Sequence, residues 1–533
     1  MKYVEPRLGP DPDAGAEGAI GPSPRCALRE EGVIVNTRVI VAGVLSFAAG
    51  QAFADGLSGS VSYTDGGGTA RPARRITVQV FAANPAGDTL VGEFRTDDAG
   101  AWSGSVLPPP GSFGYFVRAV AANDATRVFT VGGVVPYSVS AGGAPLGGGA
   151  IPPITIDTSG GNAERSFAVA DALQTGWLYG SAMRGAAPAR VNTTFPETGA
   201  GTASYYEPAT GLHIRQWRRY AWDVLTHEYS HYLADIDSLD ANPGGPHAFG
   251  VSNITPGPDG KLNGVRLAWG EALATYNGTA AQAVSAHPAS PTTGDTVYTS
   301  LNTDTPASTF EVNLDTHAGT GTTGVNAGEG DETSVMRILW DLADGTGGSE
   351  PHDRVTLGHT SLYGMINNDI PGIDQLNGLW NHLITRPGTT DALRVDYGAI
   401  FEEYGVSPHP VGDLIGAALM DSDPAPTFEW LRRNNSDNDA FGLIVFDATF
   451  STRLLDITIP GDVTSYTLTA GQWDTLNNHI GAARFVIRGS DTDQYTTGSY
   501  WSDAYGFTII PVPGAVPLAA LATVLCARRR RRS

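Results

Sequence analysis

Short runs of apolar or alternating residues lie near both ends of the chain, and longer helical patterns lie between them. The runs near the front recur about every ten residues and are separated by Gly, Pro, Asn and Asp, which is typical of β-strands joined by turns. They cover residues 59–63, 76–81, 90–94 and 115–120 at the front, and 441–446, 456–459, 465–469, 484–488 and 507–510 near the end. The pattern predicts one β-sandwich at each end.

Apolar residues in the middle of the chain instead repeat with a helical period. Residues 162–185 carry an apolar stripe and begin at Asn162, a residue that favours helix starts. Further helices are expected at residues 218–235, 267–276, 376–383 and 392–404 and around the stripe Val335, Ile338, Leu339 and Leu342. The central part is therefore predicted to be mainly helical.

Two stretches rich in Gly, Pro or Asp separate these patterns and predict linkers. We expect a multidomain chain with a β-sandwich at 55–141, a linker at 142–155, a mainly helical α+β domain at 156–420 and a second sandwich at 421–510. The hairpin pattern at 96–102 resembles transthyretin-like or carboxypeptidase-regulatory-like domains, and the pattern at 421–510 is similar to immunoglobulin or fibronectin-III sandwiches. The first sandwich is interpreted as a spacer, with an adhesive module as the alternative.

The expected helix at 218–235 contains the spacing His227-Glu228-x-x-His231. Residues four apart lie one turn above each other on the same helix face, so the two imidazoles point at one place, as a tetrahedral zinc ion requires. Glu228 then lies beside the metal rather than on it. The alternative is a helix with two surface histidines, so a third ligand is needed.

Glu271 is the candidate for that ligand. It lies on the expected helix 267–276, which Gly278 is predicted to end, and it shares a face with the small residues Ala274 and Thr275. Alone, a glutamate in such a helix is more often an ordinary surface residue. Given the two histidines, we interpret it as the third metal ligand.

The motif H-E-x-x-H followed by W-x-E-x-x-A-T-Y resembles the gluzincin superfamily of zinc metallopeptidases. The resemblance implies a zincin-like domain with His227, His231 and Glu271 as Zn2+ ligands, and with Glu228 as the general base that deprotonates a zinc-activated water. Neither the thermolysin-like nor the zinc-aminopeptidase signature is present, so the subfamily stays open. Further candidates are His359 and Tyr363 for transition-state stabilisation, and Asp223, Asp235 and Thr275 for orienting the ligands.

Both ends of the chain carry targeting patterns. Residues 35–54 combine a basic start, an apolar run and an A-x-A site, which predicts a secretory signal peptide, and residues 1–34 are interpreted as a mis-annotated upstream extension. Residues 511–533 combine Pro-Val-Pro, an apolar stretch and an arginine cluster. This tail resembles the PEP-CTERM sorting signal, which implies a sorting peptidase as a partner. The alternative is a plain membrane anchor.

Composition agrees with export. The net charge of −22 and the near absence of lysine disfavour nucleic acid as a partner. The only two cysteines, Cys26 and Cys526, lie outside the expected mature region, so any zinc site there must use His and carboxylate ligands.

The leading hypothesis is an exported zinc endopeptidase that acts on protein or peptide substrates at the cell surface or in the extracellular matrix. The alternative is a non-enzymatic surface or matrix adhesion protein on a degenerate peptidase scaffold. Exopolysaccharide is a further candidate partner of the exported protein. A zinc hydrolase with a substrate other than peptide is the third hypothesis.

Overall fold

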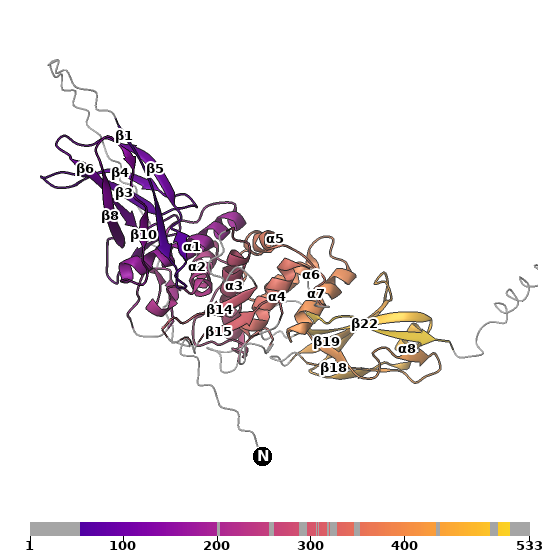
Figure 1. The fold of residues 1–533 in the computed structure, drawn as a ribbon. Coiled ribbons are helices and arrows are strands. Elements are labelled where there is room, and N and C mark those ends of the chain that lie inside the picture. The colour runs from indigo at the N-terminus through magenta and orange to yellow at the C-terminus, as the bar shows by residue number, and fades with distance from the viewer. Residues whose placement is uncertain are drawn as a thin grey trace, which may run out of the picture. The chain divides into compact units, whose positions relative to one another are not determined.

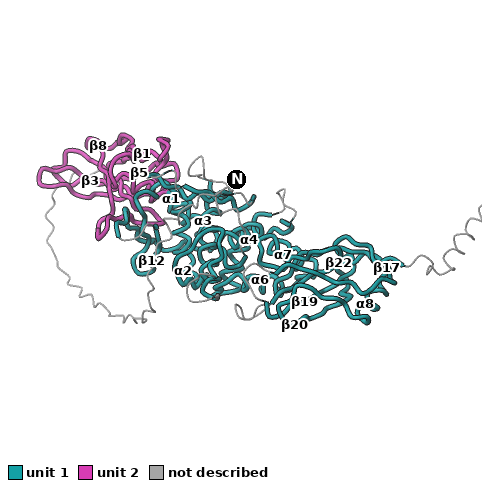
Figure 2. Tube along the Cα trace, turned by 90° about the horizontal axis from the view of Figure 1, so that it is seen from below, with its two compact units in different colours: residues 1–16, 172–533 teal, residues 17–171 magenta. Residues whose placement is uncertain are grey.

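The computed structural model describes residues 54–199, 203–254, 261–286, 296–304, 306, 309–316, 319, 328–345, 352–432, 438–490 and 499–511. The segments expected to be an upstream extension (1–34), a signal peptide (35–54, except Ala54) and a sorting tail (511–533, except Pro511) lie outside the described residues. The described residues up to Asp171 form one compact unit and those from Ala172 onward form another (Figure 2). The division falls within helix α1 (Asn162–Arg184).

The first unit contains two β-sheets. One is built around β1 (Asp55–Thr64), which pairs with β2 (Ala70–Pro72), β5 (Ala101–Val106), β9 (Gly149–Ala150) and β10 (Ile154–Ile156). The other has the order β4-β3-β6-β8, with β4 at Thr89–Arg95, β3 at Thr77–Ala83, β6 at Gly114–Val120 and β8 at Ser138–Pro145. The buried residues alternate along β3, as the sequence pattern predicts for strands with one face in a core.

The stretch 142–155, which we expected to be a linker, supplies strand residues to this unit. Strand β8 continues to Pro145, and β10 pairs in parallel with β1 through Ile154 and Ile156, which are both buried. The glycines and prolines of this stretch therefore lie between short strands rather than in a free connection. Composition alone does not distinguish these two situations.

The N-terminal part of the second unit contains the two helices that carry the candidate metal ligands (Figure 1). Helix α2 (Trp222–Asp237) carries His227 and His231, and helix α3 (Lys261–Ala283) carries Glu271. The other elements of this region are the strands β11 (Val191–Thr194), β12 (Tyr205–Glu207) and β13 (Gly211–His213), the hairpin β14 (Val297–Ser300) and β15 (Phe310–Asn313), and the helices α4 (Glu332–Asp344), α5 (His359–Gly364), α6 (Leu376–Thr385) and α7 (Asp391–Glu403).

Helix α3 does not end at Gly278, so that expectation was wrong. The glycine lies inside the helix, where an added Cβ would come within 2.8 Å of the backbone nitrogen of His227. Its missing side chain allows α3 to approach the backbone of α2, and the hydroxyl of Thr226 donates to the Gly278 carbonyl at 3.1 Å. This close approach brings Glu271 towards the two histidines.

The C-terminal part of this unit contains a six-stranded sheet with the path β17-β24-β22-β19-β20 and with β23 paired to β22. Its strands are β17 (Ala418–Met420), β19 (Ala440–Asp447), β20 (Arg453–Pro460), β22 (Gly481–Ser490), β23 (Tyr500–Trp501) and β24 (Tyr505–Ile510). A second sheet joins β16 (His409–Val411), β18 (Thr427–Leu431) and β21 (Ser465–Thr467), and helix α8 (Ala470–Asn477) packs beside it.

The larger sheet is covered on both faces. Leu443 and Val445 of β19 pack towards the smaller sheet and α8, whereas Ile444 and Phe446 share a core with helices α6 and α7. The continuous apolar run 441–446 is typical of a strand that is buried on both sides. Strands β16 and β17 precede residue 421, so the predicted boundary at that residue cuts through these sheets. Among the described residues, none of the helices combines the length and the apolar character needed to cross a membrane.

Candidate metal centre

Helix α2 brings two imidazoles together. The Nε2 atoms of His227 and His231 lie 3.1 Å apart, with the rings nearly perpendicular. The first ring is nearly buried and the second is partly exposed. The i, i+4 spacing on the helix face explains this convergence.

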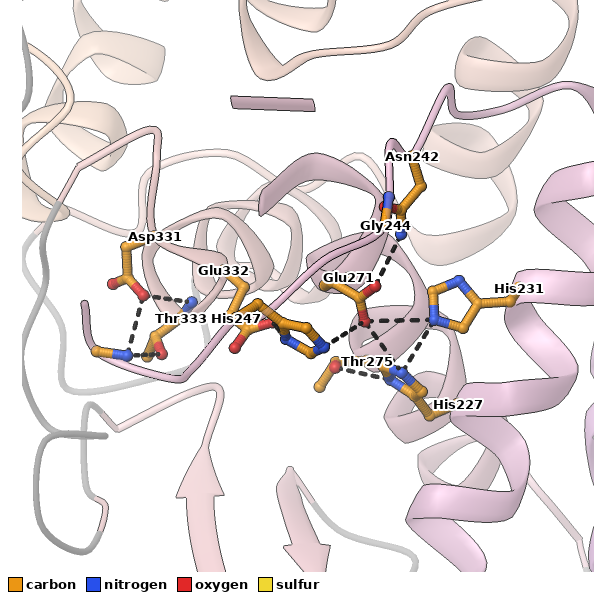
Figure 3. A network of polar contacts seen from close by, with 11 residues as sticks. His227, His231, Asn242, Gly244, His247, Glu271, Thr275, Asp331, Glu332 and Thr333 are labelled. Carbon is orange, nitrogen blue, oxygen red and sulfur yellow. Dashed lines mark hydrogen bonds and ion pairs between the residues drawn. The ribbon is translucent and has the colours of Figure 1, made fainter. Parts of the chain in front are cut away.

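Glu271 completes a triangle of ligand atoms (Figure 3). Its Oε2 lies 3.5 Å from Nε2 of His227 and 3.4 Å from Nε2 of His231. Ligands bound at about 2.0–2.1 Å in a tetrahedral zinc site lie roughly 3.3–3.4 Å from one another. The three atoms therefore have the separations of three corners of such a site, and the donor set of two imidazoles and one carboxylate is one that zinc accepts.

Neighbouring side chains hold these groups in position. The Nδ1 atom of His227 lies 2.9 Å from the hydroxyl oxygen of Thr275, which can accept a hydrogen bond from Nδ1–H and so leave Nε2 with its lone pair for a metal. The amide of Asn242 donates to Oε1 of Glu271 at 2.7 Å, which leaves Oε2 for a metal. Thr275 was a candidate from the sequence, whereas Asn242 was not.

Glu228 is buried beside the two histidines. One of its carboxylate oxygens lies within 4.8 Å of ligand atoms of His227 and His231. Only 6% of the residue is exposed. This is the neighbourhood that the sequence predicts for a base next to the metal.

The structure adds His247 and Glu332 to this region. Nε2 of His247 lies 3.8 Å from Oε2 of Glu271, and Nδ1 lies 3.1 Å from Oε2 of Glu332, the first residue of α4. His247 belongs to the loop that connects α2 and α3. Sequence periodicity does not mark loop residues, and the only hint is a histidine in a Gly- and Pro-rich stretch after the motif.

The electrostatics follow from burial and from this histidine set. Burial lowers the pKa of His227 to about 4. Burial also acts to lower the pKa of His231, but Glu271 outweighs it and raises the pKa to about 10. Burial acts to raise the pKa of Glu271, but His247, His231 and His227 together lower it well below its usual range. Glu271 is thus held as a carboxylate, the form that binds metal. Burial raises the pKa of Asp240, near His231, to about 6.

The other candidates from the sequence have partners elsewhere. Asp223 accepts bonds from Gln282 and from the backbone of Thr299, and Asp235 accepts one from Tyr206. His359 bonds to Tyr276, and Tyr363 donates to Asp237. The described contacts therefore bring Thr275 to the metal centre, whereas those of Asp223, Asp235, His359 and Tyr363 run to other residues.

Comparisons with known proteins add little to this picture. No family model matches the chain, and no curated protein sequence matches it. A 9R-lipoxygenase from Cyanothece PCC8801 matches 27% of this chain and 25% of its own at 11% identity and a TM-score of 0.15. An (S)-allantoin synthase matches 19% of this chain and 41% of its own at 18% identity and a TM-score of 0.13. The matched parts thus span less than half of either structure. At these TM-scores neither structure bears on the fold or the activity of this chain.

Proposed function

We propose that this protein is an exported zinc endopeptidase with one zinc ion held by His227, His231 and Glu271. The observation that carries the proposal is the triangle of ligand atoms with sides of 3.1, 3.4 and 3.5 Å. The hydrogen bonds between His227 and Thr275 and between Asn242 and Glu271 support it, because metal ligands are usually oriented by such partners.

Each residue has a distinct part in the proposed hydrolysis. A zinc ion at this place supplies Lewis acidity, which lowers the pKa of water and polarises a peptide carbonyl. Glu228 takes the proton from the attacking water and delivers it to the leaving amine. Thr275 fixes the ring of His227, and Asn242 fixes the carboxylate of Glu271.

The same proposal covers the location of the protein. The signal pattern at 35–54 and the sorting pattern at 511–533 support export to the cell surface or the extracellular matrix, with a sorting peptidase acting on the tail. The zincin-like and immunoglobulin-like assignments of the domains belong to the proposal as well.

Substitution of Glu228 by Gln tests the activity. The purified protein is loaded with zinc and incubated with fluorescently quenched casein and a mixed quenched-peptide library. We expect Glu228→Gln to bind one zinc as before and to lose hydrolysis by about 1000-fold, within the range for loss of a general base. Glu429→Gln, on strand β18, is the matched control and should keep full activity.

Two results would count against the proposal. Unchanged hydrolysis in Glu228→Gln would remove its central residue. A protein that folds but binds no stoichiometric zinc would favour the surface adhesion protein instead.

A further inference from the structure

The contacts of Glu271 continue past the proposed zinc ligands to a second donor set. Oε2 of Glu271 faces Nε2 of His247 at 3.8 Å, and Nδ1 of His247 faces Glu332 at 3.1 Å. Figure 3 shows His247 and Glu332 reaching Glu271 from the side away from His231. Potential ligand atoms of His247, Glu271 and Glu332 all lie within 4.8 Å of one another.

This second set lies where buried negative charge accumulates. Glu271 is 4% exposed, and at the start of α4 Glu329, Asp331 and Glu332 are exposed by no more than 1%. Carboxylates removed from water need hydrogen bonds and positive charge close by, and metal ions are a common source of that charge. A divalent cation between Glu271 and Glu332 would supply two positive charges at this point.

The loop that carries His247 is fixed around the set. Asn242 holds Glu271, and on the other side of His247 the backbone N–H of Gly250 donates to Asp331 at 3.0 Å and to the hydroxyl of Thr333 at 2.8 Å. His247 is therefore held between two anchored points. Such anchoring is what a metal ligand on a loop requires.

We propose that His247, Glu332 and Glu271 bind a second divalent cation of the zinc, cobalt or manganese type, with Glu271 shared between the two sites. One imidazole and two carboxylates suit such ions. One ion binds a single nitrogen of His247, and the two contacts above use opposite ring nitrogens, so the Glu332 carboxylate must move from Nδ1 towards the nitrogen that holds the ion. The candidate ligand atoms already lie within 4.8 Å of one another, close to the roughly 3.0–4.4 Å separations around a six-coordinate ion with bonds of about 2.1–2.2 Å. Sites with two neighbouring metals that clamp one substrate group are common in hydrolases.

The competing arrangement has a single metal. In it, Glu332 orients His247 and no second ion binds. The two arrangements differ in the number of metal ions per chain, which is measured without any substrate.

The test counts metal ions on the purified full chain. The protein is stripped with a chelator and dialysed against free Zn2+, and bound zinc is measured by mass spectrometry. We expect about two ions per wild-type chain and about one in His247→Ala and in Glu332→Gln, with unchanged circular dichroism. His382→Ala removes a histidine that lies 3.7 Å from Asp369 on another part of the unit. It is the control and should keep two ions.

Substitution with Co2+ gives a second measurement. Two adjacent Co2+ ions couple magnetically, so the wild type should show a weakened electron paramagnetic signal per ion, and His247→Ala should restore the signal of one isolated ion. One ion in the wild type, or two in both variants, would overturn the proposal.

The second site rests on the proposed function only through the shared Glu271. A single ion together with full hydrolysis would leave the peptidase proposal intact. Two ions without hydrolysis would leave the second site intact and remove the peptidase.

Discussion

The proposed metal centre and the C-terminal end of helix α4 both contain buried carboxylates that face histidines, but the number of imidazoles around each carboxylate differs. In the centre, three imidazoles lie within 4 Å of Glu271 and lower its pKa well below the usual range. At the end of α4, burial raises the pKa of Asp341, although His352 lies 3.4 Å away and the hydroxyl of Tyr404 donates to Asp341 at 2.8 Å.

The neighbours of each carboxylate explain the difference. Asp344 lies near Asp341 at the end of α4, and Asp353 adds a third negative charge there. Burial, followed by the charge of Asp341, raises the pKa of Asp353 to about 6. The C-terminus of a helix also carries partial negative charge, which disfavours carboxylates there. What distinguishes the proposed metal centre is that three imidazoles converge on Oε2 of Glu271, whereas Asp341 faces His352 together with the neighbouring acids Asp344 and Asp353.

Glu271→Gln removes the charge on which these imidazoles converge, and it is the largest effect that we expect. The amide keeps the shape but loses the anionic ligand, so zinc affinity should fall by at least about 1000-fold, measured by competition with a chromogenic chelator. The matched control is Glu429→Gln, the same change at an exposed glutamate of strand β18 away from the ligands. Zinc binding that survives Glu271→Gln unchanged would mean that the triangle is not a metal site.

Gly278→Ala tests the close approach of α2 and α3 that creates the centre. The new methyl group would lie 2.8 Å from the backbone nitrogen of His227, so the helices must separate. We expect a loss of about 1–3 kcal/mol in the free energy of unfolding, as for overpacked cores, together with weaker zinc binding. Urea unfolding of the metal-free protein measures the loss in the free energy of unfolding. Gly471→Ala in α8 is the control, because nothing lies within 4 Å of its added Cβ.

These helices also show what the sequence predicts and what it does not. The i, i+4 spacing predicts that His227 and His231 converge, because helix geometry sets their direction, and the structure has both on α2. The same reasoning placed Glu271 on a helix but ended that helix at Gly278. A glycine that allows another backbone to approach looks, in sequence, like a glycine that ends a helix.

Loops and sheet boundaries were less predictable for a related reason. Asn242 and His247 reach the centre from a connection without periodicity, so only the folded chain brings them there. The run 441–446 was expected in a separate sandwich, yet it packs against helices on one face. A run of apolar residues predicts that a strand is buried, but it does not predict which element packs against the strand. The peptidase assignment itself remains a prediction.

Thr275→Val tests the centre by removing the hydroxyl group that faces Nδ1 of His227. The hydroxyl of Thr275 holds Nδ1 of His227 at 2.9 Å, and the isosteric valine leaves the ring free to turn. We expect zinc affinity to fall about 10- to 100-fold, the range for partners that orient metal ligands. Thr279→Val on the same helix is the control, because among the described residues its hydroxyl donates to the backbone carbonyl of Thr275 and not to a candidate ligand. Equal losses in both variants would indicate a general effect on α3.

Asp344→Asn gives the smallest effect and tests the acidic end of α4. Burial, followed by the charges of Asp353, Asp341 and Asp315, raises the pKa of Asp344 to about 7. A carboxyl group whose pKa is raised on folding destabilises the folded state once it ionises, so this contribution is absent below about pH 4 and grows until about pH 7. The Asp344 side chain is more than a third exposed, and solvent therefore screens the repulsion to about 1 kcal/mol.

The variant should therefore be more stable than the wild type by about 1 kcal/mol at pH 8 and equally stable at pH 4, in urea unfolding at both pH values. The asparagine oxygen can still accept the bond that Trp340 donates to Asp344, so a packing change does not explain the gain. A gain of the same size at both pH values would show that charge is not the cause. No gain at pH 8 would mean that the end of α4 tolerates its carboxylates as well as the metal centre does, and the contrast between the two regions would fail.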